Sequence, residues 1–149
     1  MEQPLLPVGC VIMASGLARR FGSNKLLADF GGRPLLCRAL DATNTPQLAA
    51  RIVVTRSAEV EALCKAEGVP CLVHALPGRN DTVRLGLDAL LAARPDLAGC
   101  MFLPGDQPLL QRETVESMVG IFGWDTKTRI ERQKETEREI FRLGAVAEN

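Results

Sequence analysis

Short apolar runs alternate with amphipathic segments along the first two thirds of the chain. Four nearly continuous apolar runs predict strands, at 8–14, 51–55, 70–74 and 99–103. Between them, helical spacing of apolar residues predicts three helices, at 35–43, 58–67 and 82–93. Strands that are apolar at nearly every position are typical of a parallel sheet covered on both faces. We therefore expect an α/β fold, a doubly wound and mostly parallel sheet with helices on both faces.

Proline, glycine and short polar residues mark the ends of these helices. Pro34 can occupy the first position of the first helix, and Gly68 closes the second. Asn80 or Asp81 can cap the third helix, which ends at Pro95. These boundaries agree with the apolar pattern and support the same order of elements.

The pattern changes after Thr114. Residues 115–122 can form another helix, but 125–149 are dominated by charged side chains, and no fifth apolar strand follows. Such a segment cannot bury enough apolar surface to fold alone. We expect an α/β domain over 1–124 and a charged tail over 125–149, either helical or disordered.

Composition excludes several classes of protein. The chain has 149 residues, a length typical of one domain, and 46% of them are hydrophobic, which is ample for a core. The formal net charge is zero, so nothing favours a nucleic-acid partner. No apolar run approaches the roughly 20 residues that span a bilayer, and the first residues lack a basic segment. We expect a cytoplasmic protein with no membrane partner.

Cysteine and histidine do not form a metal or nucleophile motif. The five cysteines have no C-x-x-C spacing, and we expect buried free thiols in a reducing compartment: Cys10, Cys37, Cys64, Cys71 and Cys100. The single histidine, His74, follows an apolar run and is interpreted as a strand-end or loop residue rather than a catalytic base.

Three segments that follow predicted strands carry the candidate chemistry. The first runs from Ala14 through Ser15 and Gly16 to Arg20 and Lys25. Small residues let the backbone approach a ligand and expose amide groups to an anion. Arginine and lysine then bind phosphate as a planar fork and as a point charge. The alternative is an ordinary turn with solvated charges.

The other two segments offer a carboxylate for a metal ion and a helix N-terminus for a ligand. Asp106, directly after the fourth predicted strand, is a natural Mg2+ ligand beside phosphates, although it could be a simple turn residue. Gly78–Thr82 leads into a helix N-terminus, which suits a base or ribose edge, although plain helix capping explains it equally well. Because ligands gather at the carboxyl ends of parallel strands, we expect the three loops to meet there.

Three motifs carry a family resemblance: MASGLARRFGSNKLL, GRNDTVRLGL and FLPGDQP. Together they resemble the molybdenum cofactor nucleotidyltransferases, the MobA-like NTP transferases, and especially their CTP-using, MocA-like branch. The resemblance covers roughly 8–114 and implies a Rossmann-like nucleotidyltransferase fold. The later strands and the Gly-His-Pro type motif of that family do not follow, so the family fold is expected to be truncated at the C-terminus.

The resemblance also implies roles for individual residues. The nucleotide would be bound by Ala14, Ser15, Gly16, Leu17, Arg20, Lys25, Gly78 and Thr82. Arg20, Lys25 and Asp106 would be catalytic, with Asp106 binding Mg2+. The guanylyl branch usually has glycine where this chain has Ser15, which favours CTP.

The implied activity is Mg2+-dependent transfer of a nucleotidyl group, CMP from CTP, to molybdopterin with release of pyrophosphate. A molybdoenzyme client and a homo-oligomer paired through the tail are further expectations. Two alternatives stay open: a non-catalytic nucleotide-binding maturation factor, and a nucleotidyltransferase for a sugar phosphate or polyol phosphate. An NAD-binding protein is disfavoured because the first loop lacks G-x-G-x-x-G.

Overall fold

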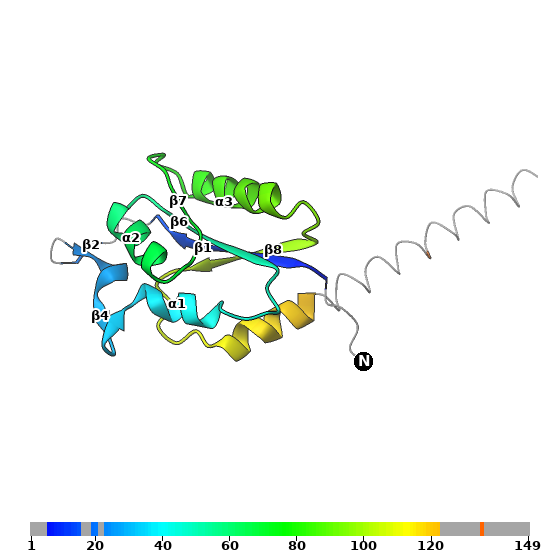
Figure 1. Cartoon of the computed structure of the whole chain (residues 1–149), viewed down its shortest axis with the longest axis horizontal. Coiled ribbons are helices and arrows are strands. Elements are labelled where there is room, and N and C mark those ends of the chain that lie inside the picture. The colour runs from blue at the N-terminus through cyan, green and yellow to red at the C-terminus, as the bar shows by residue number, and fades with distance from the viewer. Residues whose placement is uncertain (1–5, 16–18, 21–22, 123–134, 136–149) are drawn as a thin grey trace, which may run out of the picture.

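A four-stranded parallel sheet forms the centre of the molecule (Figure 1). The computed structural model describes residues 6–15, 19–20, 23–122 and 135. The strand order is β7-β6-β1-β8. The strands are β1 (Val8–Ala14), β6 (Ala50–Thr55), β7 (Cys71–Val73) and β8 (Gly99–Pro104). All four lie at or within one residue of the predicted apolar runs.

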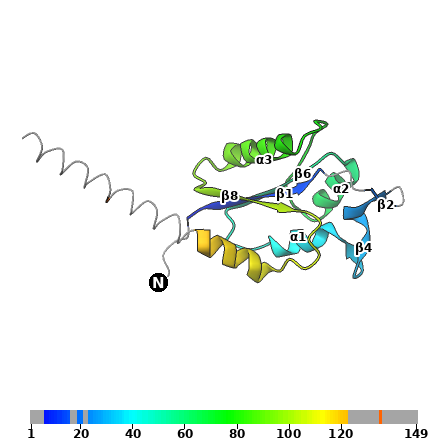
Figure 2. The same ribbon diagram turned by 180° about the vertical axis from the view of Figure 1, so that it is seen from behind.

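Helices cover both faces of the sheet, as the apolar pattern predicts (Figures 1 and 2). One face packs against α1 (Leu36–Ala42), α2 (Ala58–Ala66) and a helix at 112–122. The opposite face packs against α3 (Arg79–Ala93). The α/β, doubly wound fold is therefore confirmed.

Alternation along β1 explains how one strand serves two cores. Cys10 and Ile12 lie in the cluster with α1 and α2, whereas Val11 lies in the cluster with α3. All three side chains are fully buried. Successive residues of a strand point to opposite faces, so a central strand must be apolar throughout.

The start of α1 differs from the prediction. Pro34 is not its first residue but the end of β5 (Arg33–Pro34), which pairs with β4 (Asp29–Phe30). The Leu35 N–H donates to Ala28 O at 2.9 Å, which closes this hairpin before α1 begins. The fixed φ of proline therefore serves the hairpin and not the helix.

The start of α3 also differs. The N-cap is Gly78, so neither Asn80 nor Asp81 caps the helix. Asp81 is the third residue of the helix, and its Oδ2 accepts the Gly78 N–H at 3.1 Å. A carboxylate at this third position can reach back to the cap N–H, which explains why the helix begins three residues before Thr82. Gly68 does end α2, with a φ of +72°.

Short elements fill the connection between β1 and α1. They are β2 (Arg19–Arg20), β3 (Ser23–Asn24), the 3-10 helix η1 (Lys25–Leu27), and the β4–β5 hairpin. Leu26 is 6% exposed and lies in the main core cluster. Burying this one side chain fixes η1 against the domain.

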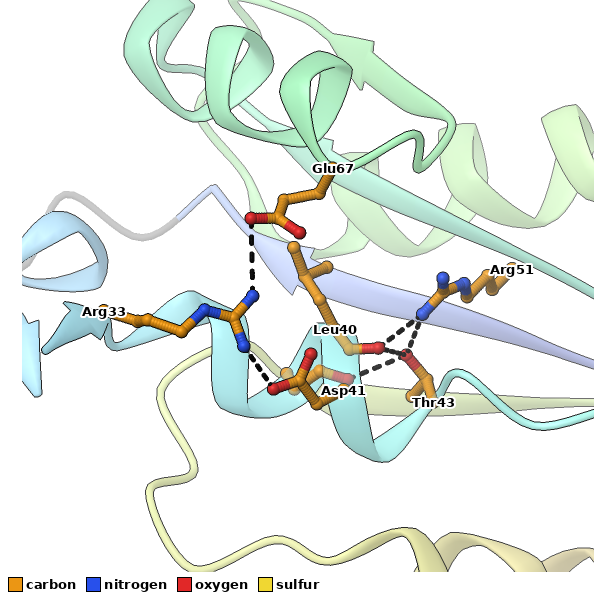
Figure 3. A network of polar contacts seen from close by, with 7 residues as sticks. Arg33, Leu40, Asp41, Thr43, Arg51 and Glu67 are labelled. Carbon is orange, nitrogen blue, oxygen red and sulfur yellow. Dashed lines mark hydrogen bonds and ion pairs between the residues drawn. The ribbon is translucent and has the colours of Figure 1, made fainter. Parts of the chain in front are cut away.

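Two arginines link α1 to neighbouring elements, Arg33 through ion pairs and Arg51 through hydrogen bonds (Figure 3). Arg33 forms ion pairs with Asp41 of α1 and, at 3.3 Å, with Glu67 after α2. Arg51 of β6 donates to Leu40 O and to Thr43 Oγ1 at the end of α1. Burial lowers the pKa of Arg51, whose partners are uncharged oxygens. These contacts tie α1 to its neighbours on the side of the sheet away from α3.

Three further predictions concern the cysteines, membrane-spanning segments and the charged tail. All five cysteines are free, as predicted, and Cys10, Cys37 and Cys64 are buried. Cys71 and Cys100 are only partly buried, contrary to the prediction, because they lie in the edge strands β7 and β8. No helix in the described ranges is long and apolar enough to cross a membrane. The predicted tail at 125–149 lies outside the described residues except for Glu135, so its conformation stays a prediction.

Candidate functional site

The strand order defines where a ligand can enter. The chain passes from β1 to β6 and β7 on one side, then returns to β8 on the other side of β1. In such sheets the crevice lies outside the carboxyl ends of the two strands where the order reverses. Here these strands are β1 and β8, and the residues that follow them are Ser15 and Gly105–Asp106.

Gly105 holds the two strand ends together. Its N–H donates to Met13 O at 2.9 Å. A Cβ at this position would lie 2.9 Å from Leu36 Cδ1 and 3.3 Å from Met13 O. A side chain here would therefore fit only if Leu36 and the backbone at Met13 shifted slightly, so glycine favours this close approach.

Lys25 and Asp106 bring the first and third loops together. Lys25 Nζ lies 3.7 Å from Asp106 Oδ2, and the two side chains are 37% and 43% exposed. Both side chains are thus held at the crevice yet remain open to solvent. The predicted meeting of these loops is confirmed.

Hydrogen bonds with β6 fix the end of β1 and the residue that follows it. The buried Thr55 hydroxyl donates to Ala14 O at 2.9 Å. Ser15 Oγ donates to Val54 O at 3.2 Å. The Ser15 hydroxyl is therefore turned toward the sheet.

His74 joins the first loop to the second. It directly follows β7, as predicted, and its Nε2 lies 3.0 Å from Ser15 Oγ and 3.2 Å from Thr82 Oγ1. The Leu76 N–H donates to the other ring nitrogen, Nδ1, at 3.1 Å. All three predicted loops therefore meet at the carboxyl end of the sheet.

Arg56 is a residue of this site that sequence reasoning missed. It follows β6 directly, and its Nε donates to Ser15 O at 3.1 Å while Nη1 donates to Leu76 O at 3.4 Å. One guanidinium thus clamps the backbones of two loops. Its position at the end of a central strand was the available signal, because polar residues there face the crevice. The contacts of His74 were also missed, although His74 likewise follows a strand, β7, at the same end of the sheet.

The other predicted residues occupy the same region to different degrees. Ala14 ends β1, Gly78 caps α3, and Thr82 lies in the first turn of α3 with only 3% of its surface exposed. Arg20 lies in β2, paired with Ser23. Gly16 and Leu17 lie outside the described residues. The individual roles of all these residues stay predictions.

Asp106 is the residue at the crevice best suited to a divalent metal. Among the residues that the structure describes, no group of three or more His, Cys, Asp or Glu side chains could hold a metal ion. Mg2+ does not require such a group, because it is commonly bound by one or two carboxylates together with phosphate oxygens and water. A single, half-exposed carboxylate beside a lysine fits a metal that arrives with a nucleotide.

Comparison with known proteins identifies the family. The family model of the MobA-like NTP transferase domain matches residues 10–136. A 3-deoxy-manno-octulosonate cytidylyltransferase of Polynucleobacter asymbioticus is 30% identical over 103 residues, covering 66% of this chain and 41% of the relative. A probable molybdenum cofactor guanylyltransferase of Pyrococcus horikoshii is 27% identical over 111 residues, covering 74% and 54%.

Solved structures agree on the fold. The crystal structure of Rv0371c from Mycobacterium tuberculosis superposes with a TM-score of 0.66 at 20% identity, covering 81% of this chain and 63% of that one. Its complex with manganese gives a TM-score of 0.62 at 19% identity, covering 78% and 60%. The chain spans about half the length of the two curated relatives, at 41% and 54%. With a matching family model over most of its length, the chain belongs to the MobA-like NTP transferase domain family of nucleotidyltransferases.

Proposed function

We propose that this chain binds CTP with Mg2+ and transfers CMP to a molybdopterin-type acceptor, with release of pyrophosphate. The observation that carries the proposal is the convergence of Lys25 and Asp106 at the crevice between β1 and β8, 3.7 Å apart. A nucleoside triphosphate with its metal needs both a cation for the phosphates and a carboxylate for the metal. This pair supplies one of each.

The proposed reaction needs no protein nucleophile. A phosphate oxygen of the acceptor attacks the α-phosphorus of the nucleotide, a new P–O bond forms, and the bond to the β-phosphate oxygen breaks. The electron pair and negative charge leave with pyrophosphate. Positioning and charge neutralisation carry most of the catalysis in such transfers.

Different residues of this chain would carry out the positioning and the charge neutralisation. Lys25 and Arg20 would hold the phosphates and offset the charge that develops on the leaving group. Asp106 would hold Mg2+, which, when bound, neutralises phosphate charge and orients the reacting groups. The backbone after Ala14 and Ser15 and the first turn of α3, with Gly78 and Thr82, would bind the nucleoside.

The nucleotide base and the acceptor are two separate choices within this proposal. Ser15 replaces a glycine of the guanylyl branch and supports CTP, while the relatives named above include both a cytidylyltransferase and a guanylyltransferase. The 30% identity to a 3-deoxy-manno-octulosonate cytidylyltransferase favours a sugar-type acceptor as the second candidate. A molybdoenzyme client, a homo-oligomer and a cytoplasmic location are part of the same proposal.

Calorimetry with CTP, GTP and ATP in the presence of Mg2+ tests nucleotide binding first. Pyrophosphate release is then measured in the same sample after addition of molybdopterin or, separately, of 3-deoxy-manno-octulosonate. Preferential CTP binding with release on molybdopterin supports the proposal, and release only with the sugar acid supports the second candidate. Binding without release would indicate a non-catalytic nucleotide-binding factor, and the absence of nucleotide binding would overturn the proposal.

A further inference from the structure

We propose that His74 is a positioning residue that sets the shape of the nucleotide-binding crevice, by donating one ring hydrogen to the hydroxyls of Ser15 and Thr82. The inference rests on the proposed function, because it assigns a role within the same site. It concerns a histidine that touches no reacting group in the proposed mechanism. Its ring lies where the loop after β1 meets the first turn of α3.

The neighbouring groups determine the protonation state of the ring. The Leu76 N–H donates to Nδ1 at 3.1 Å, so Nδ1 must present a lone pair. A neutral imidazole then carries its hydrogen on Nε2. Backbone amide hydrogens are fixed in place, unlike hydroxyl hydrogens, so this contact is the one that assigns the tautomer.

The two hydroxyls fit a donor at Nε2. Ser15 Oγ directs its own hydrogen to Val54 O at 3.2 Å, which leaves its lone pairs facing Nε2 at 3.0 Å. Thr82 Oγ1 lies 3.2 Å from the same nitrogen. One ring hydrogen is therefore shared between an oxygen of the first loop and an oxygen of α3.

Burial limits what these hydroxyls can do for a ligand directly. Thr82 is 3% exposed, and the Ser15 hydroxyl is turned toward the sheet. The two hydroxyls therefore act as supports within the site. His74 couples these supports, so its removal should loosen the relative placement of the first and second loops.

Arg56 forms a second connection between the same loops. It donates to Ser15 O at 3.1 Å and to Leu76 O at 3.4 Å, and Leu76 is also the residue that orients the His74 ring. The two connections contact the side chain and the backbone oxygen of Ser15, respectively. Loss of His74 should therefore weaken the site without unfolding it.

The variants His74→Ala and His74→Gln test the proposal. Glutamine can place an amide N–H near the position of Nε2, whereas alanine cannot. We expect His74→Ala to raise the Kd and KM for the CTP–Mg2+ complex about tenfold, which corresponds to about 1.4 kcal/mol. His74→Gln should raise them about threefold or less. The kcat of both should stay within about twofold of wild type, because the reacting groups are untouched.

A spectroscopic readout separates positioning from general packing. His74 is the single histidine among the 149 residues, so a long-range 1H–15N NMR spectrum contains one imidazole. We expect the neutral form with hydrogen on Nε2, and a change in its nitrogen shifts in Ser15→Ala and on addition of CTP with Mg2+. Hydrogen on Nδ1, or shifts insensitive to Ser15→Ala, would overturn the proposal.

The binding outcomes distinguish this inference from the proposed function. If wild type binds no nucleotide, both fail. If wild type binds CTP and a folded His74→Ala variant binds it equally well, only the role of His74 fails. Should His74→Ala not fold, Thr82→Val removes one acceptor with little change in shape, and it is expected to raise the Kd severalfold; an unchanged Kd would overturn the role.

Discussion

The ammonium group of Lys25 lies 3.7 Å from the carboxylate of Asp106 across the carboxyl end of the sheet. One residue comes from η1 and the other from the loop after β8. Since both side chains are more than a third exposed, water screens the pair and it adds on the order of 0–1 kcal/mol to stability. We therefore expect this pair to matter for the proposed nucleotide binding rather than for folding.

Lys25→Ala and Asp106→Ala should each abolish Mg2+-dependent turnover of CTP. We expect a loss of kcat/KM of at least about a hundredfold, since each change removes a charge that the transferring phosphates require. The thermal midpoint should fall by no more than a few degrees, consistent with an exposed ion pair. Pyrophosphate release and differential scanning calorimetry on the same preparations measure the two effects.

Lys65→Ala and Asp88→Ala are the matched controls, because both side chains are exposed and neither takes part in the crevice contacts described above: Lys65 lies in the last turn of α2, and Asp88 lies in α3 beyond its first turn. They should keep wild-type turnover. Full activity in Lys25→Ala or Asp106→Ala would remove that residue from the proposed site.

Gly86 of α3 lies too close to the sheet to accept a side chain. A Cβ there would be 2.6 Å from Val11 Cγ1 and 3.0 Å from Val54 Cγ2. Gly86→Ala should therefore lower the free energy of unfolding by about 1–3 kcal/mol, despite the better helix propensity of alanine. Urea denaturation followed by far-UV circular dichroism measures the change.

Gly120, in the helix at 112–122, has room for a side chain, in contrast to Gly86. Nothing lies within 4 Å of a Cβ built there. Gly120→Ala should raise the free energy of unfolding by up to about 1 kcal/mol. If Gly86→Ala were equally stabilising, the close packing of α3 on β1 and β6 would be wrong.

The cysteines should differ in reactivity toward alkylation. A hydrogen bond from the neighbouring Cys64 thiol lowers the pKa of Cys71, which is partly exposed in β7. Burial raises the pKa of Cys10 to about 12 and also raises that of Cys100. Because the thiolate is the reactive form, Cys71 should react first with iodoacetamide near pH 8. Cys10 and Cys64, which are both fully buried and have raised pKa values, should react last.

Peptide mass spectrometry after timed quenching gives the order of alkylation. In urea the five thiols should react at similar rates, since the differences come from the fold. A native protein in which Cys10 reacts as fast as Cys71 would contradict the burial of β1.

Apolar periodicity was enough to predict the sheet, its helices and the meeting of three loops. This succeeded because nearly continuous apolar runs have few structures available to them other than buried parallel strands. The contacts that organise the site were beyond such reasoning. Ser15 and His74 are 59 positions apart, and their hydrogen bond exists only because β1 and β7 end at the same edge of the sheet. Pro34 was misplaced because a local rule for helices competed with a hairpin that needs the same φ.

Arg56 gives the last prediction, because its planar fork is used on two backbone carbonyls at once. Lysine has no fork, so Arg56→Lys should lose one of the two contacts, to Ser15 O or Leu76 O. We expect the Kd for the CTP–Mg2+ complex to rise severalfold in Arg56→Lys and about tenfold in Arg56→Ala, with Arg112→Ala, an exposed arginine, as the control at wild-type affinity. Calorimetric titration of the three variants measures the ranking. If Arg56→Lys matched wild type, positive charge alone would explain the residue, and the clamp between the two loops would be unnecessary for nucleotide binding.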